Sequence, residues 1–295
     1  MRILGVGVAT LDIISLVPEY PPEDAEIRAI SRYRARGGNV GNSLILLRQL
    51  GHDCAWAGTH AEEADGRWLL AELTTAGIDT SPARGDDRGT TPTSQVWLSQ
   101  ARGSRTLVHF RDLPEYSAKD FGSLDLERWD WFHFEGRAPE ETRLMLDHLL
   151  ARRPGIGCSL EIEKPRSGIE DLFAGPSLLL FSRHYAQARG FREPRDFLLA
   201  MRQESSARWI ICAWGDQGAW GMDAQDRLYA SPAYPPATLV DSLGAGDVFN
   251  AGMIHGLSKG GHLGEVLRAA CQLAGRKCGQ LGFDHLAVGP ESPEL

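Results

Sequence analysis

Residues 241–250 read DSLGAGDVFN, a loop of small residues that runs into an acid and then an apolar segment. Gly244, Ala245 and Gly246 permit a backbone that turns successive N–H groups toward one point, where the positive end of the following helix adds to them. Such a nest binds anions and can hold the charge that builds on a transferring phosphoryl group. Asp247 follows in the first helical turn, where a carboxylate can accept the proton of an attacking hydroxyl.

A simpler interpretation of this loop stays open from these residues alone. An acid in a first helical turn offsets the helix dipole, and small residues before a helix often only form a turn. Other phosphate loops are not supported, because the chain has no G-x-x-x-x-G-K-[ST] sequence. The segment GVGVAT at 5–10 starts like a dinucleotide fingerprint, but Thr10 stands at the last glycine position.

The chain has three asparagines, two in the glycine-rich segment GGNVGN at 37–42 and one at the end of DSLGAGDVFN. Asn39 and Asn42 are three residues apart in GGNVGN, so they share a face at a helix start, while Asn250 follows Asp247 by three residues. Amide side chains suit the recognition of hydroxyls, although asparagine is also a favoured helix cap. Asp12 comes near the end of an apolar segment at 2–11, where open α/β sheets place ligand contacts, and a turn acid is the alternative.

Alternating segments are expected to position these residues. Apolar strand-like runs at 2–11, 54–61, 129–136, 155–163, 177–182 and 208–214 alternate with helical patterns, which predicts a mostly parallel sheet covered on both faces. Residues 93–112 form two β-rich runs around ARGS, a hairpin signature. Together with residues 13–36 they predict a small separate lid sheet on a single domain that spans 1–295.

Composition excludes several classes of protein. Apolar residues make up 42% of the 295-residue chain, which allows a large core. A net charge of −8 without a long basic run disfavours nucleic acid as a partner, and no segment is apolar enough to span a membrane. The five cysteines form no C-x-x-C pair, so neither a disulfide framework nor a zinc site is expected, and a cytoplasmic location fits best.

Taken together, Asp12, the GGN at 37–39 and DSLGAGD at 241–247 resemble the ribokinase-like (PfkB) family of carbohydrate kinases. Further matching segments, among them SRTLVHF, HFEGR, EIEKPR and GRKCGQLGFD, extend the resemblance to residue 284 and favour the ketose-phosphorylating branch, the ketohexokinases. The resemblance implies a three-layer αβα sandwich with a mostly parallel sheet and a β-sheet lid that often forms a dimer clasp. It implies transfer of the ATP γ-phosphoryl group to a primary hydroxyl, most simply fructose to fructose 1-phosphate.

The resemblance also implies a role for particular residues. Asp247 would be the base, and Gly244, Ala245 and Gly246 the anion hole. ATP and Mg²⁺ are the implied cofactors, with a monovalent cation such as K⁺ in addition. Sugar contacts would come from Asp12, Gly38, Asn39, Asn42 and Arg105; ATP contacts from Asp216, Gln217, Gly218, Tyr234, Pro235, Pro236, Cys278 and Gly279; and water-mediated Mg²⁺ contacts from Glu135 and Glu163.

Each of these residues also has a structural alternative. Arg105 can be a solvated hairpin charge, residues 234–236 a rigid connection, and Cys278 a packing residue. Glu135 and Glu163 can pair with Arg137 and Lys164 instead of binding a metal.

Three departures from the family pattern are visible. The chain lacks an Asn-x-x-Glu motif, as the ketose branch does; it has Ser242 where Thr is usual; and it has Arg183 where that branch has lysine.

Three other functions stay open at this stage. The nearest is a related kinase for another sugar, a sugar acid or a nucleoside. The second is a sugar-binding regulator that lost the chemistry, and the third is a nicotinamide-dependent reductase that uses the GVGVAT loop.

Overall fold

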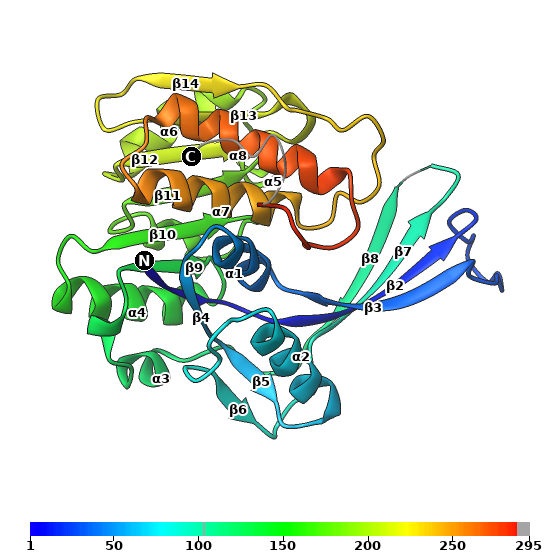
Figure 1. Ribbon diagram of the computed structural model, residues 1–295. Coiled ribbons are helices and arrows are strands. Elements are labelled where there is room, and N and C mark those ends of the chain that lie inside the picture. Colours follow the sequence, from blue (N-terminus) through cyan, green and yellow to red (C-terminus); the bar gives the residue numbers. More distant parts are fainter. Residues whose placement is uncertain (103, 288–295) are drawn as a thin grey trace.

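The structure, a computed structural model, describes residues 1–102 and 104–287, and its centre is an eight-stranded sheet (Figure 1). The strand order is β14-β13-β12-β11-β10-β9-β1-β4. The six strands from β4 to β12 run parallel, and β13 and β14 add an antiparallel edge. The strands are β1 Arg2–Val6, β4 Asp53–Ala57, β9 Trp131–Glu135, β10 Gly157–Ile162, β11 Leu178–Ser182, β12 Trp209–Ala213, β13 Ala219–Met222 and β14 Leu228–Ser231.

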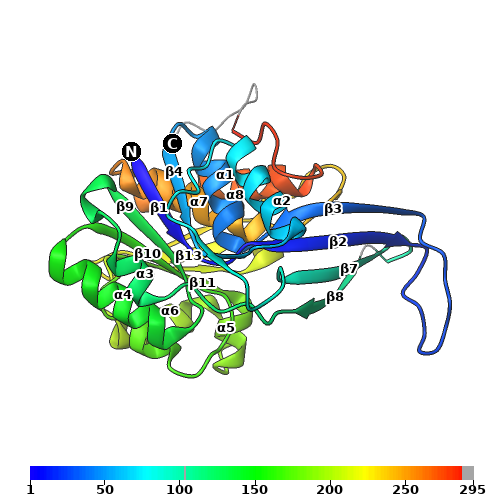
Figure 2. The same cartoon turned by 90° about the horizontal axis from the view of Figure 1, so that it is seen from below.

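Helices cover both faces of this sheet, as the side view in Figure 2 shows. One layer contains α1 Asn39–Gln49, α2 Ala64–Thr75, α7 Ala245–Ser258 and α8 Leu263–Cys278. The other contains α3 Ala118–Gly122, α4 Pro139–Arg152, α5 Arg183–Ala188 and α6 Pro194–Glu204, with short 3₁₀ turns at Leu126–Arg128 and Ile169–Leu172.

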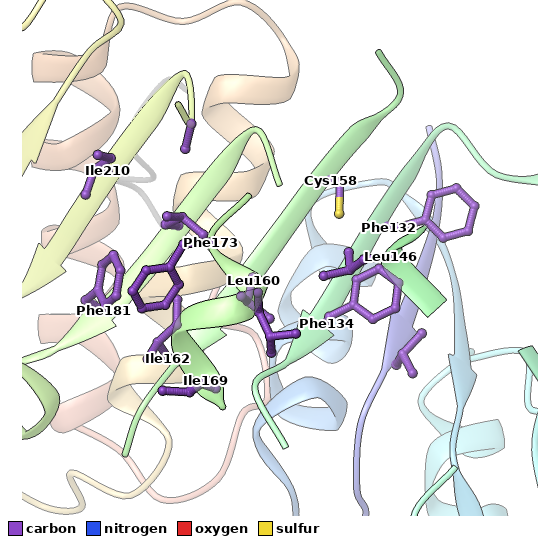
Figure 3. Packing of buried hydrophobic residues seen from close by; sticks show 14 of the residues in the cluster. Phe132, Phe134, Leu146, Cys158, Leu160, Ile162, Ile169, Phe173, Phe181 and Ile210 are labelled. Atoms are coloured by element: carbon purple, nitrogen blue, oxygen red, sulfur yellow. The ribbon is translucent and has the colours of Figure 1, made fainter. Parts of the chain in front are cut away.

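Two apolar clusters fill the spaces between these layers. The central parallel strands are apolar on both faces, as expected for strands that are buried on both sides. On the side of α4 and α6, Phe132, Leu160 and Phe181 pack with Leu146 and Phe197 (Figure 3 shows part of this cluster). The second cluster joins the other face of the sheet to α1, α7 and α8. The predicted αβα sandwich is therefore confirmed.

A second sheet projects from the carboxyl side of the main sheet (Figure 1). Its order is β3-β2-β7-β8, with β2 Thr10–Val17, β3 Ser31–Gly37, β7 Thr93–Ser99 and β8 Arg105–Phe110. We call this four-stranded sheet the lid. The β7–β8 hairpin forms where the sequence predicts it, and Gly103 in its turn lies outside the described residues.

The sequence prediction was wrong in three places. The segment 2–11 is not one strand, because β1 ends at Val6 and β2 of the lid begins at Thr10. The segment 54–61 is also divided, since β5 Thr59–Ala61 leaves the main sheet and pairs with β6 Arg84–Asp86. The antiparallel strands β13 and β14 were not predicted, because they are only four residues long each.

These boundaries exclude one of the four functions. A dinucleotide fingerprint needs a helix directly after its glycine loop, so that the pyrophosphate meets a helix N-terminus. Here the GVGVAT loop leads from β1 into β2, a strand of the lid. The nicotinamide-dependent reductase therefore loses its structural basis. Within the described part of the chain, no helix combines the length and apolarity that crossing a bilayer requires.

Candidate active site

The beginning of α7 places an acid at the carboxyl edge of the main sheet. Gly244 is the N-cap residue and adopts a left-handed backbone (φ 80°), which glycine accepts without strain. Asp247 lies in the first turn, but its side chain does not point to solvent, since the residue is only 7% exposed. An acid that served only to offset the dipole of α7 could do so from the surface and would gain nothing from burial. The interpretation of Asp247 as a simple dipole-offsetting acid is therefore not supported.

Asn42 fixes the orientation of this carboxylate. Its amide Nδ2 donates to Asp247 Oδ2 at 2.7 Å, while its Oδ1 accepts from Arg36 Nη1 at 3.0 Å. The neighbouring Ser43 hydroxyl donates to the backbone carbonyl of Asp247 at 3.0 Å. Helices α1 and α7 are therefore joined at the acid itself. The N-cap residue of α1 is Gly38, and no side chain caps this helix, so the helix-cap interpretation of Asn39 and Asn42 was wrong.

The two other asparagines meet at a glutamate that the sequence analysis did not single out. Asn39 Nδ2 and Asn250 Nδ2 both donate to Glu161 Oε1, at 3.2 and 3.0 Å. Asn39 also donates to Glu163 Oε2 at 3.2 Å. The signal for Glu161 was present in the segment EIE, because residues two apart on a strand share a face and a buried asparagine such as Asn250 needs a partner.

Four acids lie near one another at this edge and affect one another's protonation: Asp247, Glu161, Glu163 and Glu135. Burial raises the pKa of Asp247 to about 8; the bond from Asn42 opposes this shift, and the charges of Glu163 and Glu135 add to it. Burial also raises the pKa of Glu161 well above its usual value, helped by the charges of Asp247, Glu135 and Glu163. A carboxylate whose pKa lies near neutrality is suited to accept a proton and release it again.

Asp12 approaches the same region from the lid. It lies inside β2, not at the end of β1, so its predicted placement was wrong, although it remains buried. Thr10 Oγ1 donates to Asp12 Oδ1 at 3.1 Å, and burial raises the Asp12 pKa. A Cβ at Gly37 would come within 2.3 Å of the Asp12 carboxylate, and one at Gly38 within 2.2 Å of the Val8 carbonyl. The two glycines are therefore required for this close approach of the chain segments.

The loop that was predicted to form a phosphate nest packs against the C-terminal segment. A Cβ at Gly244 would lie 2.3 Å from Phe283 Cζ, so the aromatic ring packs directly against this glycine. A Cβ at Gly246 would meet no atom within 4 Å, so there is open space beside this glycine. The Ala245 N–H donates a long bond of 3.3 Å to the Ser242 carbonyl, and a phosphoryl oxygen would have to replace this contact.

Arg105 connects the lid to the nest. Its Nη1 donates to Ser242 Oγ at 3.1 Å, across from β8 to the loop that precedes Gly244. The residue is otherwise exposed, so its remaining donors are available to a ligand between the lid and the main sheet.

The residues predicted to bind ATP lie in the 216–218 turn, in the 234–236 loop and at the end of α8. Asp216 follows β12 and pairs with Arg183 at 2.9 Å, and Gln217 and Gly218 complete its turn. The 234–236 loop packs on the end of α8, since a Cβ at Gly275 would meet the Tyr234 carbonyl at 1.9 Å and one at Gly279 would meet Pro236 Cβ at 3.1 Å. Pro235 stands between these two contact residues, Tyr234 and Pro236. The Cys278 carbonyl accepts the N–H groups of Val240 and Asp241 and so joins α8 to the nest loop.

The acids at this edge differ in how well their oxygens suit Mg²⁺. Within the described residues, no group of three or more acids, histidines or cysteines is arranged to hold a metal directly. Glu135 is engaged by the Val8 N–H at 3.0 Å and by Arg137 at 3.7 Å. Glu163 is partly exposed and pairs with Lys164 at 3.2 Å, whereas Glu161 Oε2 is buried without a hydrogen-bond partner. Carboxylate oxygens of this kind fit Mg²⁺ that keeps part of its water shell.

Comparison with known proteins gives consistent results. Residues 2–286 match the model of the pfkB family carbohydrate kinases. The chain is 40% identical to mouse ketohexokinase over 292 residues, which covers 96% of this chain and 98% of the mouse protein.

Solved structures show the same fold at lower identity. The structure of ribokinase from Thermotoga maritima has a TM-score of 0.79 at 18% identity and covers 99% of this chain and 97% of its own. The structure of Arabidopsis thaliana ribokinase complexed with ribose and ATP has a TM-score of 0.77 at 16% identity, with 95% and 93% covered.

Proposed function

The chain belongs to the pfkB family of carbohydrate kinases, and we propose on this premise that it transfers the γ-phosphoryl group of ATP to a primary hydroxyl of a ketose. Fructose is the first acceptor to test, with fructose 1-phosphate as the product. The similarity to mouse ketohexokinase over nearly the full length supports the ketose. The observation that carries the proposal is the buried Asp247, which Asn42 orients beside the Gly244–Gly246 loop.

In this mechanism the sugar lies between the lid and the main sheet. Asp12, Gly38, Asn39 and Asn42 surround its hydroxyls, and Arg105 reaches the sugar or a phosphate from the lid. Asp247 accepts the proton of the attacking hydroxyl, which becomes bonded to the γ-phosphorus as the bond to ADP breaks. The N–H groups of the nest stabilise the charge that develops on the transferring group. Closure of the lid would exclude water and limit hydrolysis of ATP.

We propose that Mg²⁺·ATP is the donor and that it lies along the beginning of α7. Glu163 and the unpartnered oxygen of Glu161 would hold the ion through water, which differs from the predicted pair of Glu135 and Glu163. Bound Mg²⁺ would neutralise phosphate charge. The nucleotide would extend toward the 216–218 and 234–236 loops and the end of α8 with Cys278 and Gly279. Stimulation by K⁺ stays a prediction, which activity in potassium and tetramethylammonium salts would test.

We also propose that two copies associate through the lid, in the cytoplasm. The lid exposes large apolar side chains, with Leu107 at 45% and Phe110 at 59%. Leu107→Glu should therefore reduce dimerisation in sedimentation experiments. Leu144→Glu is the matched control, because Leu144 is similarly exposed on α4 at 41%. Equal dissociation of both variants would show that the lid is not the interface.

The deciding experiment measures ADP release from Mg²⁺·ATP with ketoses, other sugars, sugar acids and nucleosides. We expect the fastest turnover with fructose, and a loss of about 10²- to 10⁴-fold in kcat for Asp247→Asn. Asp196→Asn is the control, since Asp196 is also an acid in a first helical turn, that of α6, and is exposed. Turnover with another acceptor would keep the kinase and discard the ketose. ATP binding without any turnover would favour the sugar-binding regulator.

A further inference from the structure

Arg36 stands at the point where the lid joins the helical layer of the main sheet. It is the last residue but one of β3, and only Gly37 separates it from Gly38, the N-cap residue of α1. The side chain is partly buried, and burial lowers its pKa to about 10. A charge that leaves water has a free-energy cost, which proteins offset with acceptors and opposite charges. The contacts of Arg36 therefore indicate what its charge does.

The guanidinium of Arg36 lies between the first turn of α1 and the C-terminal segment. Its Nη1 donates to Asn42 Oδ1 at 3.0 Å, and its Cζ lies 5.9 Å from the centre of the Phe283 ring. A Cβ at Gly41 would come within 2.9 Å of Nη1. Glycine inside a helix is destabilising, so a glycine at this position of α1 is explained by the room that it leaves for the guanidinium.

The bond from Arg36 decides which way the Asn42 amide points. An asparagine amide has an oxygen that accepts and a nitrogen that donates, whereas a guanidinium only donates. The amide oxygen therefore faces Arg36, and the nitrogen is left to donate to Asp247 Oδ2 at 2.7 Å. With the amide reversed, its oxygen would face the ionised carboxylate of Asp247, and neither contact could be a hydrogen bond.

Arg36 also places a positive charge in a region rich in acids. Its charge lowers the pKa of Asp247 and that of Asp12, against the burial that raises both. The acids that act on Arg36 or on Asp247 come from several elements: Asp12 of β2, Glu72 of α2, Glu135 of β9, Glu161 of β10, Glu163 just after β10, and Asp247 of α7. Removal of the cation should therefore make Asp247 harder to ionise.

We propose that Arg36 is a positioning residue, which fixes the direction of the Asn42 amide from the base of the lid and through this amide holds the Asp247 carboxylate in the orientation of a base. The role in turnover rests on the proposed phosphoryl transfer, because it takes Asp247 as the base. The orientation and ionisation of Asp247 can be measured without turnover.

Carbon-13 NMR of the aspartate carboxyl groups measures this ionisation, and Asp247→Asn identifies the signal of Asp247. In the parent protein we expect a titration midpoint near the Asp247 pKa of about 8. Arg36→Met keeps most of the stem but removes the donors and the charge, so the midpoint should rise by about one pH unit. Arg36→Lys keeps a donor and the charge, so it should shift the midpoint less.

Activity gives a second readout. One pH unit is a factor of ten in the ionised fraction, so kcat/KM of Arg36→Met should fall about tenfold at about pH 7, but less than about twofold at about pH 10. The double variant Arg36→Met, Asn42→Leu should lose little more than Asn42→Leu alone, because both substitutions act on Asp247 through one amide.

Arg34→Met is the matched control. Arg34 lies two residues earlier on β3 and so shares a face of the strand with Arg36, but its guanidinium pairs with Asp65 and lies over the Trp68 ring. It should leave the titration of Asp247 and the pH profile unchanged. An unchanged Asp247 titration in Arg36→Met, or fully additive losses in the double variant, would overturn the proposal. If the midpoint rises as expected but the parent protein phosphorylates no acceptor, Arg36 still positions Asp247, and the kinase function is rejected.

Discussion

The lid and the carboxyl edge of the main sheet face the same site but hold their polar residues in different ways. On the lid, Arg105 is exposed and makes one bond to Ser242, and apolar residues such as Phe110 stand in solvent. At the sheet edge, Asp247 and Glu161 are buried and bonded to asparagines that are themselves fixed. Burial controls proton affinity at the edge and at Asp12, the buried acid of β2, whereas the exposed strand β8 of the lid can control only access and contact.

The sheet edge and the lid also differ in how much their charged groups lower the stability of the folded protein. Burying several acids together raises their pKa values and opposes their ionisation, so the protein stores unfavourable free energy in the group that accepts the proton. The exposed charges of the lid are screened by water and cost little. Substitutions at the edge should therefore change pH dependence, and substitutions on β8 of the lid should change mainly the apparent affinity.

The largest effect within this comparison is expected for Asn42→Leu. The bond from Asn42 favours the charged form of Asp247, so its loss should raise the pKa of Asp247 beyond about 8. A larger part of the enzyme is then protonated at neutral pH, and the base is less well oriented. We expect kcat/KM to fall by about 100-fold at neutral pH, and the rising limb of its pH profile to move to higher pH.

Ser43→Ala is the control for this prediction. Ser43 bonds to the backbone carbonyl of Asp247 and not to its carboxylate. Ser43→Ala should lower the stability of the protein slightly without moving the pH profile of kcat/KM. If Asn42→Leu leaves the pH profile in place as well, Asn42 does not set the proton affinity of Asp247.

A smaller effect, on stability, is expected for Glu161→Gln. The pKa of Glu161 is raised in the folded state, so its favourable contribution is complete below its unfolded value of 4.5 and is lost as pH rises through the folded pKa. Glutamine has a similar shape and no charge. We expect Glu161→Gln to be more stable than the parent by about 1–3 kcal/mol at about pH 8, and little different at about pH 4.

Chemical denaturation at both pH values would measure this difference. Glu163→Gln is the matched control, because Glu163 shares the partner Asn39 but its side chain is 42% exposed. It should change stability by less than about 1 kcal/mol at either pH. A Glu161→Gln variant that is less stable than the parent at about pH 8 would contradict the prediction that burial of the charge dominates.

How far the sequence allowed these features to be predicted depends on the range of the contacts. The loop and helix at 241–258 and the β7–β8 hairpin are local, and their small residues and periodicity predicted them. The departure of the chain from the main sheet after Val6 was missed, because an apolar run does not show which sheet its residues join. Glu161 was missed for a similar reason. Its partners Asn39 and Asn250 are distant from it in the sequence, and the burial that brings the three together cannot be read from residue type.

The smallest effect is expected for Arg105→Met on the lid. The variant loses the bond to Ser242 and a cationic contact to the ligand, but both are exposed to water and together contribute about 1 kcal/mol. We expect KM for the acceptor or ATP to rise about fivefold, with kcat within about twofold and an unchanged thermal midpoint. Arg102→Met, in the same hairpin, is the control and should leave both constants unchanged. A fall of kcat at constant KM would mean that Arg105 acts on the transferring group itself, and the lid would then share the chemistry that we assign to the sheet edge alone.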